Sequence, residues 1–322
     1  MSGNSLPYHL RTNKSIDRKI FFDLLSHLSS ILPSKIQEYK YISMGGPMLE
    51  DHHILHHEYG MTNLLSIERD KGTLSRQVYN RPYGCIRCEQ NTTREYINNF
   101  NEVDPVIIWL DYTDTKWATQ FQECESLLNN LKEYDILKVT FNANPDVLKD
   151  STKNKIDLFK EKANYHLISE NLTENDVQTM PNFAKTICDI FQTITQNSLG
   201  DYDLIFYPLL QFRYIDNRHQ MFTITGIVLS ESNTFIKSYH DYVVDASWDY
   251  NHNEWGDINE INVPILTQQE RYAINQLLPK LDGGDLNSLP FILDKNKEKS
   301  ERMVRNYIKY YRYIPTFQQT LT

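Results

Sequence analysis

Long apolar runs and cysteines are both scarce in this chain of 322 residues. No apolar stretch approaches the roughly 20 residues that a helix needs to cross a bilayer. The N-terminus, Met1 to Lys14, is polar and unlike a secretory signal peptide. The four cysteines are too few and too irregularly spaced for a disulfide framework: Cys85, Cys88, Cys124 and Cys188. These absences predict a soluble, cytoplasmic protein without a membrane partner.

Basic residues are outnumbered, because 33 Lys and Arg stand against 42 Asp and Glu, which leaves a net charge of −9. A negative chain repels the phosphate backbone, so binding to nucleic acid over a broad surface is disfavoured. A local basic face remains compatible with this balance. Hydrophobic residues make up 40% of the chain, enough for a large core in one big domain or in one domain with a substantial insertion.

The full G-x-G-x-x-G string of dinucleotide-binding proteins is also missing, but a shorter glycine turn is present. An apolar segment, Tyr39 to Met44, is typical of a strand and runs into Gly45-Gly46-Pro47. A second predicted strand, Leu64 to Glu68, ends on an acid. Glycines after one strand let backbone amides approach a ligand, and an acid after the next accepts hydrogen bonds from ribose hydroxyls. This partial fingerprint favours a nucleoside-binding sheet.

Strand and helix patterns alternate along the first half of the chain. We expect five strands, at residues 39–44, 64–68, 85–88, 106–110 and 136–141, with helices at 15–32, 49–59, 71–80, 94–99 and 116–132. Residues 146–200 are expected to form a helical insertion, and residues 202–215 and 220–229 a hairpin turning at Asp216-Asn217-Arg218-His219. The pattern predicts an α/β fold, a doubly wound, mostly parallel, Rossmann-like sheet with a late antiparallel hairpin.

Three regions follow from this pattern. They are an N-terminal helical segment (1–35), the α/β domain with its insertion (36–282) and a C-terminal basic and aromatic extension (283–322). The extension carries basic residues interleaved with tyrosines from residue 295 to 312, a composition that can bind nucleic acid by phosphate pairing and base stacking. We favour the simpler interpretation, an amphipathic helix whose apolar side packs inward: Met303, Val304, Ile308 and Tyr311.

Parallel strands completed by a late antiparallel hairpin are the element order of class I S-adenosylmethionine-dependent methyltransferases. Several strings resemble a bacterial O-methyltransferase family: residues 8–14 with Asp17-Arg18, residues 45–51, Ser66-Ile67-Glu68 with Arg76-Gln77 and Asn80, and a late segment from Val263-Pro264 to Leu277-Leu278-Pro279. The resemblance spans most of the chain, from residue 8 to 280. It implies S-adenosylmethionine as the cofactor and methyl transfer as the reaction, but it supplies no acceptor.

The resemblance also implies a set of cofactor-binding residues. Gly45 and Gly46 would lie beside the amino-acid portion of S-adenosylmethionine, and Glu68 would contact its ribose. The adenine would face the polar residues that end the third strand: Glu89, Gln90 and Asn91. A charged block before and within the first helix would reach over the active site and bind the substrate through Arg11, Lys14 and Arg18.

Asp111 ends the fourth strand, and the resemblance implies a catalytic place for it next to the methyl donor, with Tyr112 and Asp114 nearby. Methyl transfer needs a nucleophile in line with the sulfonium, and some enzymes add a base. The strand is not followed by the Pro-Cys pair of cytosine-carbon methylation, nor by the Pro-Pro-aromatic pattern of amino methylation. The resemblance to an O-methyltransferase family implies an oxygen acceptor. In the alternative interpretation, Thr113 or Asp114 caps the following helix.

Two clusters contain residue types that can bind a metal ion, but we do not predict a metal site at either. His52 and His56, like His53 and His57, are four residues apart on a predicted helix, a spacing that can bind a divalent ion. We favour a solvated or partly buried helix face. The Cys85-x-x-Cys88 pair lacks the second pair that a zinc site requires, so buried strand cysteines are expected.

Two other functions stay open. The chain can be a catalytically degenerate Rossmann-like nucleotide-binding module within a larger assembly, which the sparse glycines favour slightly. It can also be an enzyme that cleaves a glycosidic bond of a nucleotide with Asp111 or Glu68. For methyl transfer the acceptor, a small molecule or a macromolecule, is unidentified, and an oligomer is compatible with the sequence.

Overall fold

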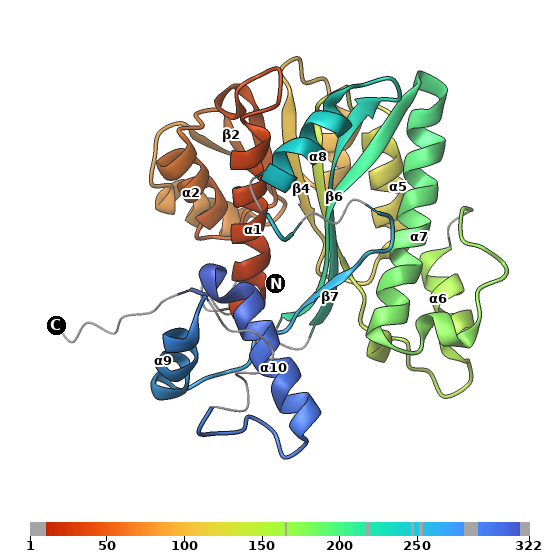
Figure 1. The fold of residues 1–322 in the computed structure, drawn as a ribbon. Coiled ribbons are helices and arrows are strands. Elements are labelled where there is room, and N and C mark those ends of the chain that lie inside the picture. Colours follow the sequence, from red (N-terminus) through yellow and green to blue (C-terminus); the bar gives the residue numbers. More distant parts are fainter. Residues whose placement is uncertain are drawn as a thin grey trace.

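An eight-stranded sheet lies at the centre of the part of the chain that the computed structural model describes (Figure 1). Those described residues are 11–164, 166–216, 219–245, 248–250, 254–279 and 289–315. The strands are β1 (Lys40–Ser43), β2 (Leu64–Glu68), β3 (Ile86–Gln90), β4 (Val106–Asp111), β5 (Ile136–Asn142), β6 (Leu204–Asp216), β7 (His219–Ser230) and β8 (Asn259–Ile261).

The strands are ordered β3-β2-β1-β4-β5-β7-β6-β8 across the sheet. The first five are parallel, β7 pairs antiparallel with both β5 and β6, and β8 is parallel to β6. The order reverses between β1 and β4, and parallel sheets of this kind bind ligands outside the carboxyl ends of their strands at such a point. The predicted doubly wound fold with a late antiparallel hairpin is confirmed. Two residues of the predicted hairpin turn, Asn217 and Arg218, lie outside the described residues.

Helices cover both faces of the sheet: α1 (Thr12–Leu28), α2 (Glu50–Tyr59), α3 (Lys71–Asn80), α4 (Thr93–Asn98), α5 (Trp117–Leu128), α6 (Lys155–Ala163), α7 (Met180–Leu199), α8 (Phe235–Asp245), α9 (Gln268–Leu277) and α10 (Lys297–Tyr310) (Figure 1). Because side chains alternate along a strand, β4 supplies two cores. Ile107 and Trp109 pack with α1, α2, α8 and α10, whereas Ile108 and Leu110 pack with α4 to α7.

The C-terminal extension packs against α1 as an amphipathic helix. Val304, Tyr307 and Tyr310 of α10 are buried in the same core as α1. The hydroxyl of Tyr313, just beyond α10, donates a hydrogen bond to the carboxylate of Asp23 on α1 at 2.5 Å. The buried ring faces of Tyr307 and Tyr310 are therefore occupied by the protein's own core.

The structure extends the third strand beyond its predicted end. β3 continues to Gln90, so Glu89 and Gln90 belong to the strand itself and not to a polar segment after it. The reason is the position of β3 at the edge of the sheet, where a strand accommodates exposed polar side chains. The first helix also starts and ends earlier than predicted, at Thr12 and Leu28.

Asp135 joins the beginnings of β4 and β5. Its buried carboxylate accepts hydrogen bonds from the backbone N–H groups of Val106 at 2.9 Å and Lys132 at 2.7 Å. Burial raises the pKa of Asp135 to about 6. The folded protein therefore holds this proton more tightly than the unfolded chain, whose aspartates titrate near pH 4.

The raised pKa predicts a loss of stability as the pH rises. The contribution of Asp135 is fully present below pH 4 and is lost between about pH 4 and 7, which lowers the free energy of unfolding by about 1 to 3 kcal/mol. Asp135→Asn should lack this part of the pH dependence. Urea unfolding of both proteins at several pH values from 4.5 to about 7.5 checks it. Identical pH slopes would show that Asp135 does not titrate in this range.

Candidate functional site

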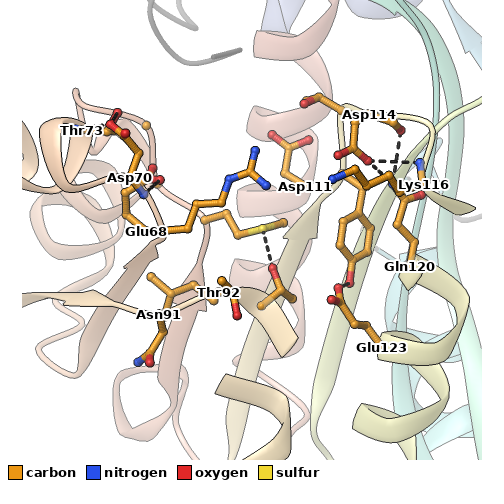
Figure 2. A pocket seen from close by; sticks show the side chains of 18 of the residues that line it. Glu68, Asp70, Thr73, Asn91, Thr92, Asp111, Asp114, Lys116, Gln120 and Glu123 are labelled. Atoms are coloured by element: carbon orange, nitrogen blue, oxygen red, sulfur yellow. Dashed lines mark hydrogen bonds between the residues drawn. The ribbon is translucent and has the colours of Figure 1, made fainter. Parts of the chain in front are cut away.

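A cavity of about 390 Å³ opens at the carboxyl ends of β1, β2 and β4. Figure 2 shows side chains from the β2 and β3 ends on one side, side chains from the β4–α5 segment on the other, and Asp111 between them. The lining residues are Met44, Gly45, Gly46, Ile67, Glu68, Arg69, Asp70, Thr73, Asn91, Thr92, Thr93, Asp111, Tyr112, Thr113, Asp114, Lys116, Thr119, Gln120 and Glu123. The cavity thus lies where parallel sheets bind ligands.

Gly45 has no room for a side chain. A Cβ atom built there would lie 2.7 Å from Ser66 Oγ, 3.0 Å from Leu49 Cδ2 and 3.1 Å from His52 Cε1. A side chain at Gly45 would have to push aside the side chains of Ser66, Leu49 and His52, which are all buried. The absence of a side chain is what lets the backbone of the turn run along the wall of the cavity.

Glu68 and Asp70 form the β2 side of the cavity. One carboxylate oxygen of Glu68 accepts the backbone N–H of Asp70 at 2.8 Å. Asp70 caps α3 by accepting the backbone N–H of Thr73 at 2.8 Å and its hydroxyl at 2.9 Å, and these bonds lower the pKa of Asp70. Both side chains are thereby oriented by short local hydrogen bonds. Of the three residues predicted to face the adenine, Asn91 lines the cavity, while Glu89 and Gln90 do not.

Asp111 is held by the first helix. Its Oδ2 atom lies 2.6 Å from Lys14 Nζ, while its Oδ1 atom is buried without a hydrogen-bond partner among the described residues. Lys14 Nζ also lies 4.0 Å from a carboxylate oxygen of Asp216, and Arg11 bonds the same oxygen at 3.0 Å. A buried polar atom without a partner is uncommon and is often completed by a ligand.

The basic residues that the sequence predicts for substrate binding do not line the cavity. Arg11 and Lys14 are buried against Asp216 and Asp111. Arg18 is also buried and pairs with Asp51, and its guanidinium lies over the ring of Trp109. Lys14 contacts the cavity residue Asp111 from outside the lining, and the role of all three cations toward a substrate stays a prediction.

The β4–α5 segment forms the other wall. The Tyr112 hydroxyl donates a hydrogen bond to Glu123 at 2.8 Å, and burial raises the pKa of both groups. Asp114 accepts a hydrogen bond from Gln120 at 2.7 Å. Tyr112 and Asp114, both predicted as catalytic, thus line the cavity with their polar atoms already bonded to α5. A protonated Tyr112 can donate a hydrogen bond but cannot serve as a base.

Sequence reasoning missed the contribution of α5. The signal was present, because Thr119, Gln120 and Glu123 are spaced to share one face of a helix that starts just after Asp114. Asp70 and Thr73 were missed as well, although they form an N-cap pattern directly after the predicted acid Glu68.

The cavity lining carries more carboxylates than basic side chains, and Lys14 offsets part of this excess by pairing with Asp111. The lining includes five carboxylates, Glu68, Asp70, Asp111, Asp114 and Glu123, against two basic side chains, Arg69 and Lys116. This excess attracts a cationic ligand and repels a highly anionic one.

The histidines of α2 lie elsewhere. His52 is buried, His53 stacks on His57 and Tyr83, and the ring of His56 hydrogen-bonds the Met61 carbonyl at 2.8 Å. In the part of the chain that the structure describes, no three His, Cys, Asp or Glu side chains gather as a metal site would require. In that same part, no helix has the length and apolar character to cross a membrane.

Comparison with known proteins identifies the family. The profile of a family described as "Putative O-methyltransferase" matches residues 6–322. A search of curated proteins finds no match. Among solved structures, Trm1 from Pyrococcus horikoshii with S-adenosyl-L-methionine shares 11% identity at a TM-score of 0.44, covering 69% of this chain and 57% of that one. This chain thus matches little more than half the length of Trm1.

Two further solved structures are similar. A putative O-methyltransferase from Klebsiella pneumoniae shares 10% identity at a TM-score of 0.39, covering 70% of this chain and 83% of that one. The N-methyltransferase NodS from Bradyrhizobium japonicum WM9 shares 9% identity at a TM-score of 0.37, covering 67% and 97%. The family match, which spans nearly the whole chain, confirms the resemblance seen in the sequence. This protein therefore belongs to the family described as "Putative O-methyltransferase".

Proposed function

We propose that this protein transfers the methyl group of S-adenosylmethionine to an oxygen atom of its acceptor, and that it does so in the cytoplasm. The observation that carries the proposal is the convergence of the glycine turn, Glu68 and Asp111 on one cavity at the carboxyl ends of β1, β2 and β4. The described cysteines are all free thiols, which agrees with a reducing compartment.

The residues of the cavity fit S-adenosylmethionine. The cofactor carries a sulfonium, an ammonium and a carboxylate, so its net charge is positive and matches the acidic lining. Gly45 and Gly46 both line the cavity and carry no side chain, so the backbone of the turn can approach a ligand closely. Glu68 is a carboxylate at the end of β2, suited to the ribose hydroxyls. When bound, the cofactor supplies an electrophilic methyl group on sulfur.

Asp111 supports an oxygen acceptor. An acceptor hydroxyl loses its proton as its oxygen bonds the methyl carbon, while the carbon–sulfur bond breaks. The Oδ1 atom of Asp111, which has no hydrogen-bond partner among the described residues, accepts that proton, and Lys14, bonded to Oδ2, fixes the carboxylate. Methylation of a cytosine ring carbon or of a base amino group would need other groups, and the Asp111-Tyr112-Thr113-Asp114 segment lacks the residue patterns that serve them.

The acceptor atom can be tested without knowing the acceptor. Purified protein is incubated with S-adenosylmethionine carrying a ¹³C-labelled methyl group and a small-molecule extract, with the Asp111→Asn variant as control. The carbon chemical shift of the transferred methyl group distinguishes oxygen, nitrogen, sulfur and carbon acceptors. We expect an O-methyl signal that Asp111→Asn reduces strongly. A labelled N-methyl or C-methyl product would contradict the oxygen assignment.

Glu68→Ala should weaken the binding of S-adenosylmethionine by about 1 to 3 kcal/mol, the usual cost of losing a charged hydrogen-bond acceptor. Glu89→Ala is a matched control, since Glu89 is an exposed acid on the neighbouring strand that does not line the cavity. Isothermal titration calorimetry of both variants and of the wild-type protein measures the difference in affinity for S-adenosylmethionine. Equal affinities for all three proteins would remove Glu68 from the cofactor site.

A further inference from the structure

The carbonyl groups of the glycine turn are bonded to one face of α3. Gln77 Nε2 donates to the carbonyl of Gly45 and lies 3.4 Å from the carbonyl oxygen of Gly46. One helical turn later, Asn80 Nδ2 donates to the carbonyl of Pro47 at 3.0 Å. Two amide side chains three residues apart thus hold three consecutive carbonyls of the turn.

These bonds also set the direction of the turn's N–H groups. In a trans peptide the C=O and the following N–H point in opposite directions. Holding the Gly45 carbonyl toward α3 therefore points the N–H of Gly46 away from α3. Gly45 and Gly46 both line the cavity, whereas Gln77 does not line it and is completely buried. Gln77 thus acts on the cavity wall from behind.

The same helix begins at the cavity. Asp70, the N-cap of α3, lines the cavity beside Glu68. The helix therefore connects the two parts of the wall, the acid at the end of β2 and the glycine turn after β1. The buried Gln77 Oε1 atom has no hydrogen-bond partner among the described residues, so only the donor end of this amide is used.

We propose that Gln77 and Asn80 are positioning residues that hold the glycine turn in the conformation that binds S-adenosylmethionine. The proposal rests on the proposed cofactor site for its functional part, because the turn must contact the cofactor for its shape to matter. Its structural part, that α3 orders the turn, stands on the contacts alone.

Gln77→Leu is the most direct test, because leucine fills a similar volume and offers no donor to the two carbonyls. We expect faster amide hydrogen exchange in residues 45–49 and affinity for S-adenosylmethionine about tenfold lower, the effect of one lost hydrogen bond to a buried carbonyl. Gln77→His should restore slow exchange and most of the affinity. The histidine Nε2 atom, like the glutamine Nε2 atom, is three bonds from Cβ, so it can donate a hydrogen bond at the same place. Val78→Ala, at an exposed neighbouring position, should change neither quantity.

The outcomes separate the two proposals. Unchanged exchange and affinity in Gln77→Leu would overturn the positioning role. A merely space-filling role would leave Gln77→His no better than Gln77→Leu, which also overturns it. If the unchanged protein fails to bind S-adenosylmethionine while Gln77→Leu still speeds exchange in residues 45–49, the cofactor proposal fails and the ordering of the turn stands. If Gln77→Leu does not fold, Asn80→Ala, at the exposed end of α3, should produce the same changes to a smaller degree, and no change there would again refute the role.

Discussion

Replacing Lys138 with methionine should lower the free energy of unfolding by about 3 to 5 kcal/mol, the usual result of leaving a buried charge without its partner. Lys138 Nζ lies 2.8 Å from the Asp17 carboxylate on α1, and both side chains have no exposed surface. The ammonium also lies over the rings of Phe21 and Trp109, at 5.2 and 4.9 Å from their centres. Burial lowers the pKa of Lys138 and raises the pKa of Asp17, so each group needs the other to remain charged.

Urea unfolding of Lys138→Met measures this loss. The double variant Asp17→Asn with Lys138→Met is the control, because it removes the stranded carboxylate along with the cation. We expect it to be more stable than Lys138→Met alone, since a neutral pair avoids an unpaired buried charge. If the free energy of unfolding of Lys138→Met lies within about 1 kcal/mol of the wild-type value, this ion pair does not hold α1 on the sheet.

Gly45→Ala should reduce the affinity for S-adenosylmethionine at least about tenfold and destabilise the fold by about 1 to 3 kcal/mol, the cost of overpacking a filled site. The new Cβ would lie 2.7 Å from Ser66 Oγ and 3.0 Å from Leu49 Cδ2, so these buried side chains or the glycine turn must shift. A displaced turn changes the wall of the cavity directly. The prediction is checked by isothermal titration together with urea unfolding.

Gly84→Ala is the matched control for that experiment. A Cβ at Gly84 meets no atom within 4 Å, so the same chemical change should leave affinity and stability nearly unaltered. Gly45→Ala with normal affinity would mean that the turn tolerates a side chain and does not shape the cofactor site.

The fold could be predicted because each buried strand carries a simple apolar signal. In β4, Ile107 and Trp109 face one core while Ile108 and Leu110 face the other, so the whole segment reads as an apolar run. The end of β3 could not be placed in this way. Glu89 and Gln90 are polar, and nothing local shows that their strand lies at a sheet edge where polar residues are tolerated.

The candidate site could be predicted only where its residues follow strands. Glu68 and Asp111 end apolar runs, and both line the cavity. The surroundings of Lys14 and Arg11 could not be predicted, because their partners are far along the chain, 97 residues away for Asp111 and 205 for Asp216. In the sequence alone, the basic residues at the start of α1 resemble an exposed basic block, because the carboxylates that they contact are known only from the fold.

The support of the glycine turn was hidden for a similar reason. Gln77 and Asn80 belong to a string that resembles the family, but the spacing of apolar residues in α3 suggests an ordinary surface helix. The buried residue of this helix is the polar Gln77, which a hydrophobic pattern does not mark. Its bond partners are the carbonyls of residues about 30 positions earlier. Hydrogen bonds from side chains to distant backbone leave no periodic pattern in a sequence.

The central claim is that the cavity at the ends of β1, β2 and β4 binds S-adenosylmethionine. The most direct measurement is an isothermal titration of the purified protein with S-adenosylmethionine and with its demethylated product. We predict saturable binding of one molecule per chain for both ligands, weakened by Glu68→Ala and by Gly45→Ala but not by Glu89→Ala. Absence of binding of either ligand at high micromolar concentration, or binding that all three variants leave unchanged, would contradict the assignment of this cavity as the cofactor site.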